Sequence, residues 1–231
     1  MTQSPTTTVD ESRIVRLFGF WSAILSAIFY LAFDVAEAMN LSGALTTPYW
    51  ITITVYGPSL LIALSFVVLM ASLHNSVSQD RRFWTSLALT FATIYATLNC
   101  FIYVIQVLVI APSFVHGTFD KLALFGMSQD NPLSSGNSPL VAVNALAYTL
   151  MSVSTFFASF AIAGKGLNRW ARILLRIHGA VAPTVMGALI WPGLILVSAT
   201  VGITYPIAAI LLALVFKSAF QSGRLVREDA P

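Results

Sequence analysis

Residues 83–111 constrain the fold of this chain more than any other stretch, because they are apolar over a length that exceeds the thickness of a bilayer. At about 1.5 Å of rise per residue, a helix over this stretch is roughly 43 Å long. The hydrocarbon core of a membrane is about 30 Å thick. The stretch therefore predicts a transmembrane helix.

Four polar side chains recur along this helix at helical spacing, namely Tyr95, Asn99, Tyr103 and Gln106. They fall at i, i+4, i+8 and i+11, so they share one face. An unpaired amide in hydrocarbon costs several kcal/mol. We therefore expect this face to meet neighbouring helices or a wet cavity, and not lipid.

The whole chain has the composition of a polytopic membrane protein. It is 57% hydrophobic and only 9% charged, whereas soluble domains carry about 25% charged residues. Apolar runs cover roughly 14–37, 49–72, 83–111 and 139–163, and 172–219 is long enough for two helices. The sequence predicts an all-α fold of six transmembrane helices. We place the last turn between Trp191 and Ile203, and we expect Pro183, Pro192 and Pro206 to interrupt the final two helices.

These runs also define the predicted domain organisation. Residues 1–12 lack an apolar period and predict a disordered cytoplasmic tail. Residues 13–220 form the six-helix membrane domain, and 221–231 form a second cytoplasmic tail. The longest loop, 112–139, joins helices three and four on the outer side. Within it, Phe119, Leu122 and Phe125 predict a short amphipathic helix on the membrane surface.

The positions of the basic residues predict the orientation. With six spans, Lys121 is the only one of the 12 basic residues that does not fall on the same side as both termini. Lys and Arg near span ends resist translocation, so that side is predicted to be cytoplasmic. We therefore expect a multi-pass protein of the cell inner membrane. The net charge of +3 reflects this topology and possible contact with anionic lipid, and it does not indicate a nucleic-acid partner.

Polar residues gather at one level in the outer halves of the first four helices. Carboxylates near a membrane boundary are costly and usually face a cavity or a partner, which favours an outward-facing polar pocket. The predicted ligand-binding residues are Asp34, Glu37, Tyr56, Tyr103, Gln106, His116, Asn144 and Tyr148. The alternative is that these side chains pair across helices for about 0.6 kcal/mol each, with the acids wetted at the surface.

The residue types allow two further sites, one for acid/base chemistry or metal binding and one for lipid head groups. Asp34, Glu37 and His116 could act as an acid/base set or bind a divalent metal, but their spacing is unspecific. No HExxH, CxxC, GxSxG or phosphate-loop motif is present, so we expect no catalytic residue, metal or cofactor. On the cytoplasmic side, a lipid head group could contact a basic face, although the positive-inside rule explains the same residues: Lys165, Arg169, Arg172 and Arg176.

The segment 94–172, about a third of the chain, resembles a family of uncharacterised bacterial six-span integral membrane proteins. The resemblance is carried by Ile94-Tyr95-Ala96, Tyr103-Val-Ile-Gln106, Pro112-Ser113, Leu122-Ala-Leu-Phe125, Asn131-Pro132, Ala147-Tyr148-Thr-Leu-Met151-Ser152 and Gly166-Leu-Asn-Arg169. It implies a six-helix protein of a bacterial inner membrane. The family brings no assigned reaction, ligand or catalytic residue.

Three functional classes follow from these observations. The first, which we favour, is a protein that binds or transports a small or lipophilic ligand in the outward-facing pocket. The second is a membrane enzyme acting on a lipid or isoprenoid. The third is a structural or accessory subunit of a membrane complex, whose partner would be another membrane protein or a second copy of this chain.

Overall fold

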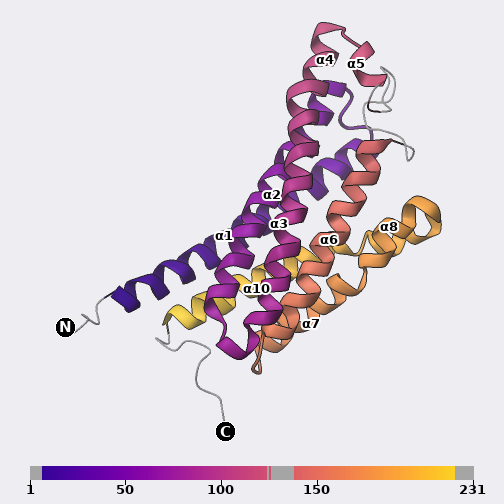
Figure 1. Ribbon diagram of the computed structural model, residues 1–231. Helices are drawn as coiled ribbons and strands as arrows, with labels where there is room; N and C mark the ends of the chain where they lie inside the picture. Colours follow the sequence, from indigo (N-terminus) through magenta and orange to yellow (C-terminus); the bar gives the residue numbers. More distant parts are fainter. Residues whose placement is uncertain (1–6, 124, 126–137, 222–231) are drawn as a thin grey trace.

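The computed structural model describes residues 7–123, 125 and 138–221, and secondary structure within them is helical (Figure 1). Three long helices come first: α1 (Thr7–Leu41), α2 (Pro48–Ser76) and α3 (Arg82–Ile105). A π-helical turn, Gln106–Ile110, continues α3 directly into α4 (Ala111–His116), and the short α5 (Asp120–Ala123) follows. The remaining helices are α6 (Pro139–Ala161), α7 (Leu167–Ala180), α8 (Ala182–Ile190), α9 (Ile195–Ser198) and α10 (Val201–Gln221), with 3-10 turns at Gln79–Arg81 and Pro192–Leu194.

The prediction of six spans is confirmed. Among the described residues, six helical segments are long and apolar enough to cross a membrane: Ser12–Leu41, Pro48–Ser76, Gln79–His116, Pro139–Ala161, Leu167–Ile190 and Pro192–Ala219. The chain is therefore a multi-pass membrane protein. The last turn also lies where the sequence predicted it, because α8 ends at Ile190 and α10 begins at Val201.

The three prolines of the last two spans differ in whether they interrupt a helix. Pro183 lies just after the break between α7 and α8, and Pro192 opens a 3-10 turn, as predicted. The expectation for Pro206 is wrong, since α10 runs through it without a break. A proline removes the hydrogen bond to the carbonyl four residues earlier, which here belongs to Gly202 in the first turn of α10. The loss so close to the helix start leaves the rest of the helix intact.

The N-terminal tail also differs from the sequence expectation. The first helix begins at Thr7, so residues 7–12 of the expected disordered tail are helical. The expected C-terminal tail lies outside the described residues except for Gln221, which ends α10. Residues 126–137 of the expected outer loop likewise lie outside them.

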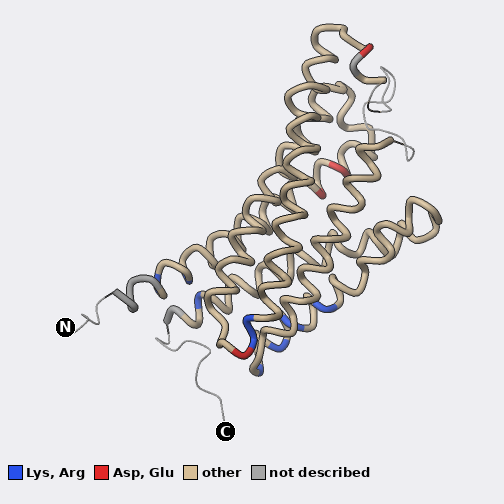
Figure 2. The backbone as a smooth tube through the Cα atoms, viewed as in Figure 1, with Lys and Arg blue, Asp and Glu red and all other residues tan. Residues whose placement is uncertain are grey.

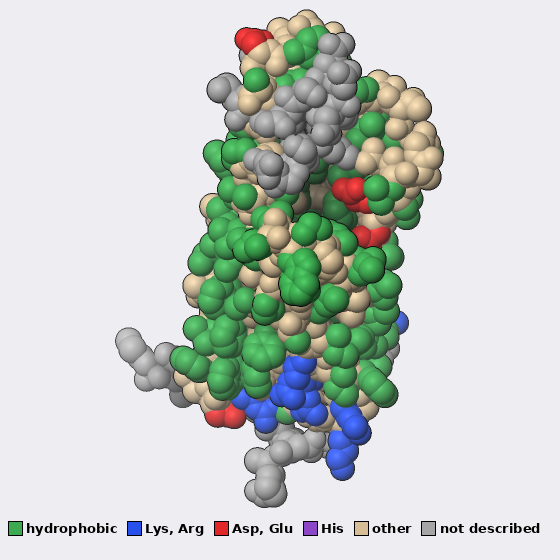
Figure 3. Space-filling view, turned by 90° about the vertical axis from the view of Figure 1, so that its right-hand side faces the viewer, with side chains coloured by type: hydrophobic (Ala, Val, Ile, Leu, Met, Phe, Trp, Pro, Cys, Tyr) green, Lys and Arg blue, Asp and Glu red, His purple; other side chains and the backbone are tan. Residues whose placement is uncertain are grey.

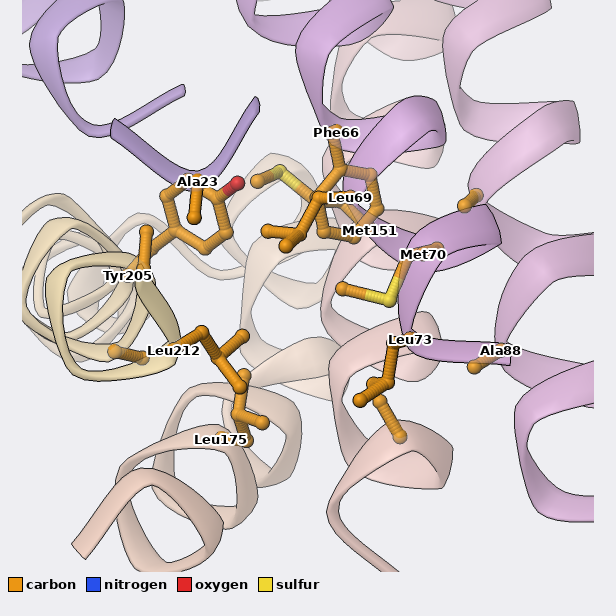
Figure 4. Close-up of a cluster of buried hydrophobic side chains, with 14 of the residues drawn as sticks. Ala23, Phe66, Leu69, Met70, Leu73, Ala88, Met151, Leu175, Tyr205 and Leu212 are labelled. Atoms are coloured by element: carbon orange, nitrogen blue, oxygen red, sulfur yellow. The ribbon is translucent and has the colours of Figure 1, made fainter. Parts of the chain in front are cut away.

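Helix packing produces two buried clusters. α1 lies between α2 and α10, α3 lies between α2 and α6, and α7 packs on α6 and α10 (Figure 1). The larger cluster fills the centre of the bundle, where Phe66, Leu69 and Met151 meet Leu175 and Leu212 (Figure 4). The second cluster joins the ends of α1 and α2 to the π-helical turn, α5 and the start of α6.

The second cluster corrects the expectation for the outer loop. The Leu122 side chain of α5 is fully buried in this cluster, and Phe119 and Phe125 pack against it. Phe119 also makes an edge-to-face contact with Phe114 of α4. The apolar side of this short helix therefore faces the protein, and not the bilayer as expected from the sequence.

Aromatic residues are divided by type between the interior and the surface. Tyr30, Tyr95, Tyr103 and Tyr205 are each at most 2% exposed. The tryptophans lie on the outside of the bundle, with four of the five more than half exposed: Trp21, Trp50, Trp170 and Trp191. The fifth, Trp84, is half-buried against Phe160. The phenol groups therefore bring polar atoms into the core, and the indoles face outward.

Charged side chains are separated along the bundle. Figure 2 shows the described Lys and Arg residues gathered at one end, which we call the basic end. α1 begins and α10 ends at this same end (Figure 1). Asp80 also lies there and forms a 3.5 Å ion pair with Arg81. Asp34, Glu37 and Asp120 lie in the opposite half, toward the end of α1 and on α5, a distribution expected if the basic end faces the cytoplasm.

Candidate functional site

Six of the seven tyrosines converge inside the bundle, and we call them the tyrosine cluster: Tyr30, Tyr56, Tyr95, Tyr103, Tyr148 and Tyr205. Their rings touch in pairs that cross helix boundaries. The centroids of Tyr56 and Tyr103 are 5.4 Å apart, and those of Tyr95 and Tyr148 are 5.9 Å apart. Phe66 contacts both Tyr95 and Tyr205, and so connects α10 to the rest of the cluster.

The polar face predicted on the third span meets polar side chains of the fourth span. The Tyr103 hydroxyl donates a 2.8 Å hydrogen bond to Oδ1 of Asn144, and it lies 3.2 Å from the hydroxyl of Tyr148. Tyr103 is fully buried, whereas Asn144 and Tyr148 are half-buried. The expectation that the polar face of residues 95–106 avoids lipid is confirmed, because Tyr95, Asn99, Tyr103 and Gln106 are all buried.

Several polar atoms on this buried face make no well-formed hydrogen bond with the described residues, although Tyr95 and Asn99 lie close to each other on the same helix. These atoms are the Tyr95 hydroxyl, both Nδ2 and Oδ1 of Asn99, and Oε1 of Gln106. Asn99 is fully buried and Gln106 is 3% exposed. Buried polar groups are nearly always paired, and each exception requires an explanation. These atoms follow one another along a single face of the third span.

Gln106 also begins the irregular part of the third span. The wide π-helical turn starts at this residue, where the Ala111 N–H bonds to the Gln106 carbonyl five residues earlier. Such turns are rare and frequently occur at functional sites. The Gln106 side chain lies close to the Tyr56 hydroxyl of α2. The irregular turn therefore places an amide between α2 and α3.

Two half-buried carboxylates lie beside the cluster on α1. Asp34 is near Glu37 and the Tyr148 hydroxyl, and Glu37 is near Tyr56. Neither carboxylate forms an ion pair with a described basic residue. Figure 3 shows acidic side chains beside a hollow in the half of the molecule opposite the basic end. The negative charges are therefore not neutralised by a neighbouring side chain.

Asp34 also contacts the last helix. A Cβ atom added to Gly202 would lie 3.2 Å from Oδ1 of Asp34, so the absent side chain makes room for the carboxylate. Gly202 lies in the first turn of α10, where the helix dipole favours negative charge. Asp34 thus connects α1 to the start of α10 as well as bordering the cluster.

His116 is not part of this assembly. It is exposed at the end of α4, which terminates at Gly117 in the left-handed conformation. No three His, Cys, Asp or Glu side chains in the described ranges are close enough to hold a metal ion. Asp34, Glu37 and His116 consequently do not form the metal site considered from the sequence.

The structure adds residues that the sequence reasoning did not place in the site. His178 is 1% exposed, and its Nδ1 lies 2.7 Å from the Thr155 hydroxyl. Its ring contacts Tyr205, whose hydroxyl forms a hydrogen bond with Ser26. Ser22, Ser26 and Tyr30 recur at helical spacing on one buried face of α1. The sequence carried no signal that α10 and His178 would meet that face.

The four basic residues proposed for lipid head groups differ in their surroundings. Arg172 donates a 3.3 Å hydrogen bond to the Ile162 carbonyl, just beyond the end of α6. Arg176 lies 3.3 Å from the Ser159 hydroxyl and 5.0 Å from the centroid of the Phe160 ring. Lys165 and Arg169 are exposed. Arg172 and Arg176 therefore bind the end of α6 and the residue after it, while Arg176 is exposed like Lys165 and Arg169.

No protein-family model, curated protein or solved structure matches this chain. The chemistry of the site rests on its own residues, which supply phenol and amide groups, two carboxylates and aromatic ring faces. These groups can hydrogen-bond to a polar portion of a molecule while the rings contact an apolar portion.

Proposed function

We propose that the chain binds or transports a small or lipophilic ligand in an outward-facing pocket of the tyrosine cluster. The pocket is formed by α1, α2, α3 and α6. Tyr56, Tyr103, Asn144 and Tyr148 surround the ligand, Gln106 hydrogen-bonds to it, and Asp34 and Glu37 lie at the entrance. We place the basic end in the cytoplasm, and the membrane is a bacterial inner membrane, as the family resemblance implies.

The unpartnered atoms of Asn99 carry this proposal. If the polar face served only to hold helices together, its amides would be paired with neighbouring helices. Tyr103 and Asn144 do pair in this way, whereas Asn99 has, among the described residues, no partner on a neighbouring helix and only Tyr95 of its own helix nearby. A buried amide without partners destabilises the fold and is retained where it has another use. Binding the polar part of a ligand is such a use.

Replacing Asn99 by leucine tests the proposal directly. Removing an unpaired buried amide is expected to leave the folded protein as stable as the parent, or more stable by about 1–3 kcal/mol. Reversible unfolding in mixed micelles would measure the change. The control is Ser154→Ala, since the Ser154 hydroxyl donates a 2.7 Å hydrogen bond to the Ala88 carbonyl and its loss is expected to destabilise. Destabilisation by Asn99→Leu would favour interhelical pairing and contradict the proposal.

A second experiment tests whether the pocket contains water and is accessible from outside the cell. In a Cys100→Ala background, Asn144→Cys is expected to react with a charged methanethiosulfonate reagent added from outside. The matched control is Ser154→Cys at a fully buried, hydrogen-bonded position, which is expected to stay unreacted.

Occupancy of the pocket can then be measured by protection of this cysteine. Naphthylmethylamine, naphthylmethanol and naphthoate present one ring system with positive, neutral and negative polar groups. We expect at least one of these probes to slow the reaction at position 144. No reaction at 144, or equal rates with and without all three probes, would contradict ligand binding here.

A further inference from the structure

A groove runs between α1 and α10 at the basic end, on the opposite side of the tyrosine cluster from the acids. It is lined by Arg16, Leu17, Phe20, Trp21, Phe216 and Lys217. Two of these side chains are positively charged and the other four are apolar. The groove lies over residues 16–21 of α1 and 216–217 of α10, near the end of the bundle where α1 begins and α10 ends (Figure 1).

A second cleft lies behind the groove and enters the bundle between α1, α2, α6 and α10. Its lining is mostly apolar and includes Leu73, Ile162 and Val215. Arg16 and Phe216 line both the outer groove and this inner cleft. Phe216 packs on Gly19, where an added Cβ would lie 2.6 Å from the ring Cζ. The Phe216 ring and the Arg16 guanidinium therefore lie between the outer groove and the smaller inner cleft.

Arg16 is fixed by three hydrogen bonds and keeps unused N–H donors. Its Nη1 donates to the Ala219 carbonyl at 2.6 Å, Nε donates to the Ser12 carbonyl at 3.1 Å, and Nη2 donates to the Ser12 hydroxyl at 3.1 Å. A guanidinium has five N–H groups, so one on each terminal nitrogen is left over. No ion pair joins Arg16 to a carboxylate of the described residues. Two free donors on a fixed planar fork match the oxygens of a phosphate.

We propose that this is a binding site for a two-chain anionic phospholipid. The phosphate lies on Arg16 with Lys217 beside it, and one acyl chain occupies the outer groove along Phe20 and Trp21. The first methylenes of the other chain enter the inner cleft, whose volume is about 40 Å³. The start of the lipid thus lies across Phe216, with one chain on each side of the ring. Apolar surfaces on both sides of a cation fit a lipid and not a free phosphate. The site is separate from Lys165 and Arg169.

Binding of defined lipids to the full chain in detergent, measured by native mass spectrometry, tests the head-group contact. Phosphatidylglycerol is expected to bind more tightly than phosphatidylcholine. Arg16→Gln and Lys217→Gln should each reduce phosphatidylglycerol binding by a factor of about five, the effect of one basic residue near an anionic surface. The control is Arg81→Gln, because Arg81 is already paired with Asp80. Equal binding of the two lipids, or no effect of Arg16→Gln, would overturn the site.

Arg16 also binds the end of α10, so Arg16→Gln could reduce lipid binding by disturbing the fold. A second variant that keeps Arg16 tests the site without this complication. Val77→Trp places a large ring in the mouth of the inner cleft, where Val77 is half-buried, and leaves both cations in place. The parent should prefer two-chain phosphatidylglycerol over its single-chain lyso form, and Val77→Trp should abolish that preference. Equal binding of both forms to the parent would contradict occupation of the inner cleft. Competition by inorganic phosphate at the same concentration as the lipid would identify a simple anion site instead.

Discussion

The Tyr103 hydroxyl on α3 and the Asn144 amide on α6 are joined by a 2.8 Å hydrogen bond at the tyrosine cluster. The two residues are 41 positions apart in the chain. Each lies on a polar face that runs along its own helix, and the bond brings those two faces together. The α3–α6 interface at this level is therefore held by polar side chains, with Tyr56 stacked on the other side of Tyr103.

Tyr103→Phe is expected to destabilise the fold by about 0.5–2 kcal/mol. The change removes the donor and leaves Oδ1 of Asn144 without that partner, while the ring and its stacking on Tyr56 are kept. Reversible unfolding in mixed micelles would measure the difference. Tyr49→Phe is the control, since Tyr49 lies at the start of α2 outside the cluster. An equal effect of the two variants would show that the Tyr103 hydroxyl contributes nothing specific.

Gln106→Leu should affect the pocket more than Leu108→Ala. Gln106 is buried beside Tyr56, whereas Leu108 is 67% exposed on the lipid-facing side. We expect Leu108→Ala to change stability by less than about 0.5 kcal/mol. Probe protection of a cysteine at position 144 and the melting temperature would report the two effects. Parent-like values of both for Gln106→Leu would show the amide to be dispensable.

Gly179→Ala is expected to destabilise the protein by about 1–3 kcal/mol or more, because α7 crosses α6 at this position. An added Cβ would lie 2.7 Å from the Phe156 Cα, and backbone cannot move aside as a flexible side chain can. Gly57→Ala is the matched control, since its Cβ would meet nothing within 4 Å inside α2. That substitution should be neutral, or stabilising by up to about 1 kcal/mol. Thermal melting of both variants would decide, and similar melting temperatures would contradict the close crossing.

The predicted orientation can be tested with single cysteines in a Cys100→Ala background. Cysteines at Gln79 and Gly166 are expected to be labelled from the cytoplasmic side only, because they lie in turns at the basic end. A cysteine at Asn137, which lies outside the described residues, is expected to be labelled from the other side. Labelling at 137 only after the cytoplasmic face is opened would reverse the orientation.

The number of spans and their approximate positions could be predicted because length and hydropathy largely decide them. The spacing of Tyr95, Asn99, Tyr103 and Gln106 also identified a buried face correctly, since a polar face in hydrocarbon must be covered by protein. These are local properties of one helix. They need no knowledge of how the helices are arranged.

The contacts between helices could not be predicted in the same way. His178 and Tyr205 meet only because α7 and α10 pack together, and nothing in either segment specifies that pairing. The amphipathic spacing of Phe119, Leu122 and Phe125 was recognised, but the same pattern suits a membrane surface and a protein surface equally. His116 was assigned to the pocket because it follows the outer end of the third span. Its position in the sequence does not indicate the direction in which its side chain points.

The separation of tyrosines from tryptophans gives the unmodified protein two distinct optical reporters. Indole emission comes mainly from the exposed rings of Trp21, Trp50, Trp170 and Trp191, so its wavelength responds to the surrounding lipid or detergent. Phenol absorption comes mainly from the buried cluster, so second-derivative ultraviolet spectra respond to hydration of the interior. A molecule that enters the cluster should alter the phenol bands first. A lipid that exchanges along Trp21 should instead alter the indole emission, so the two binding events can be followed separately in one sample.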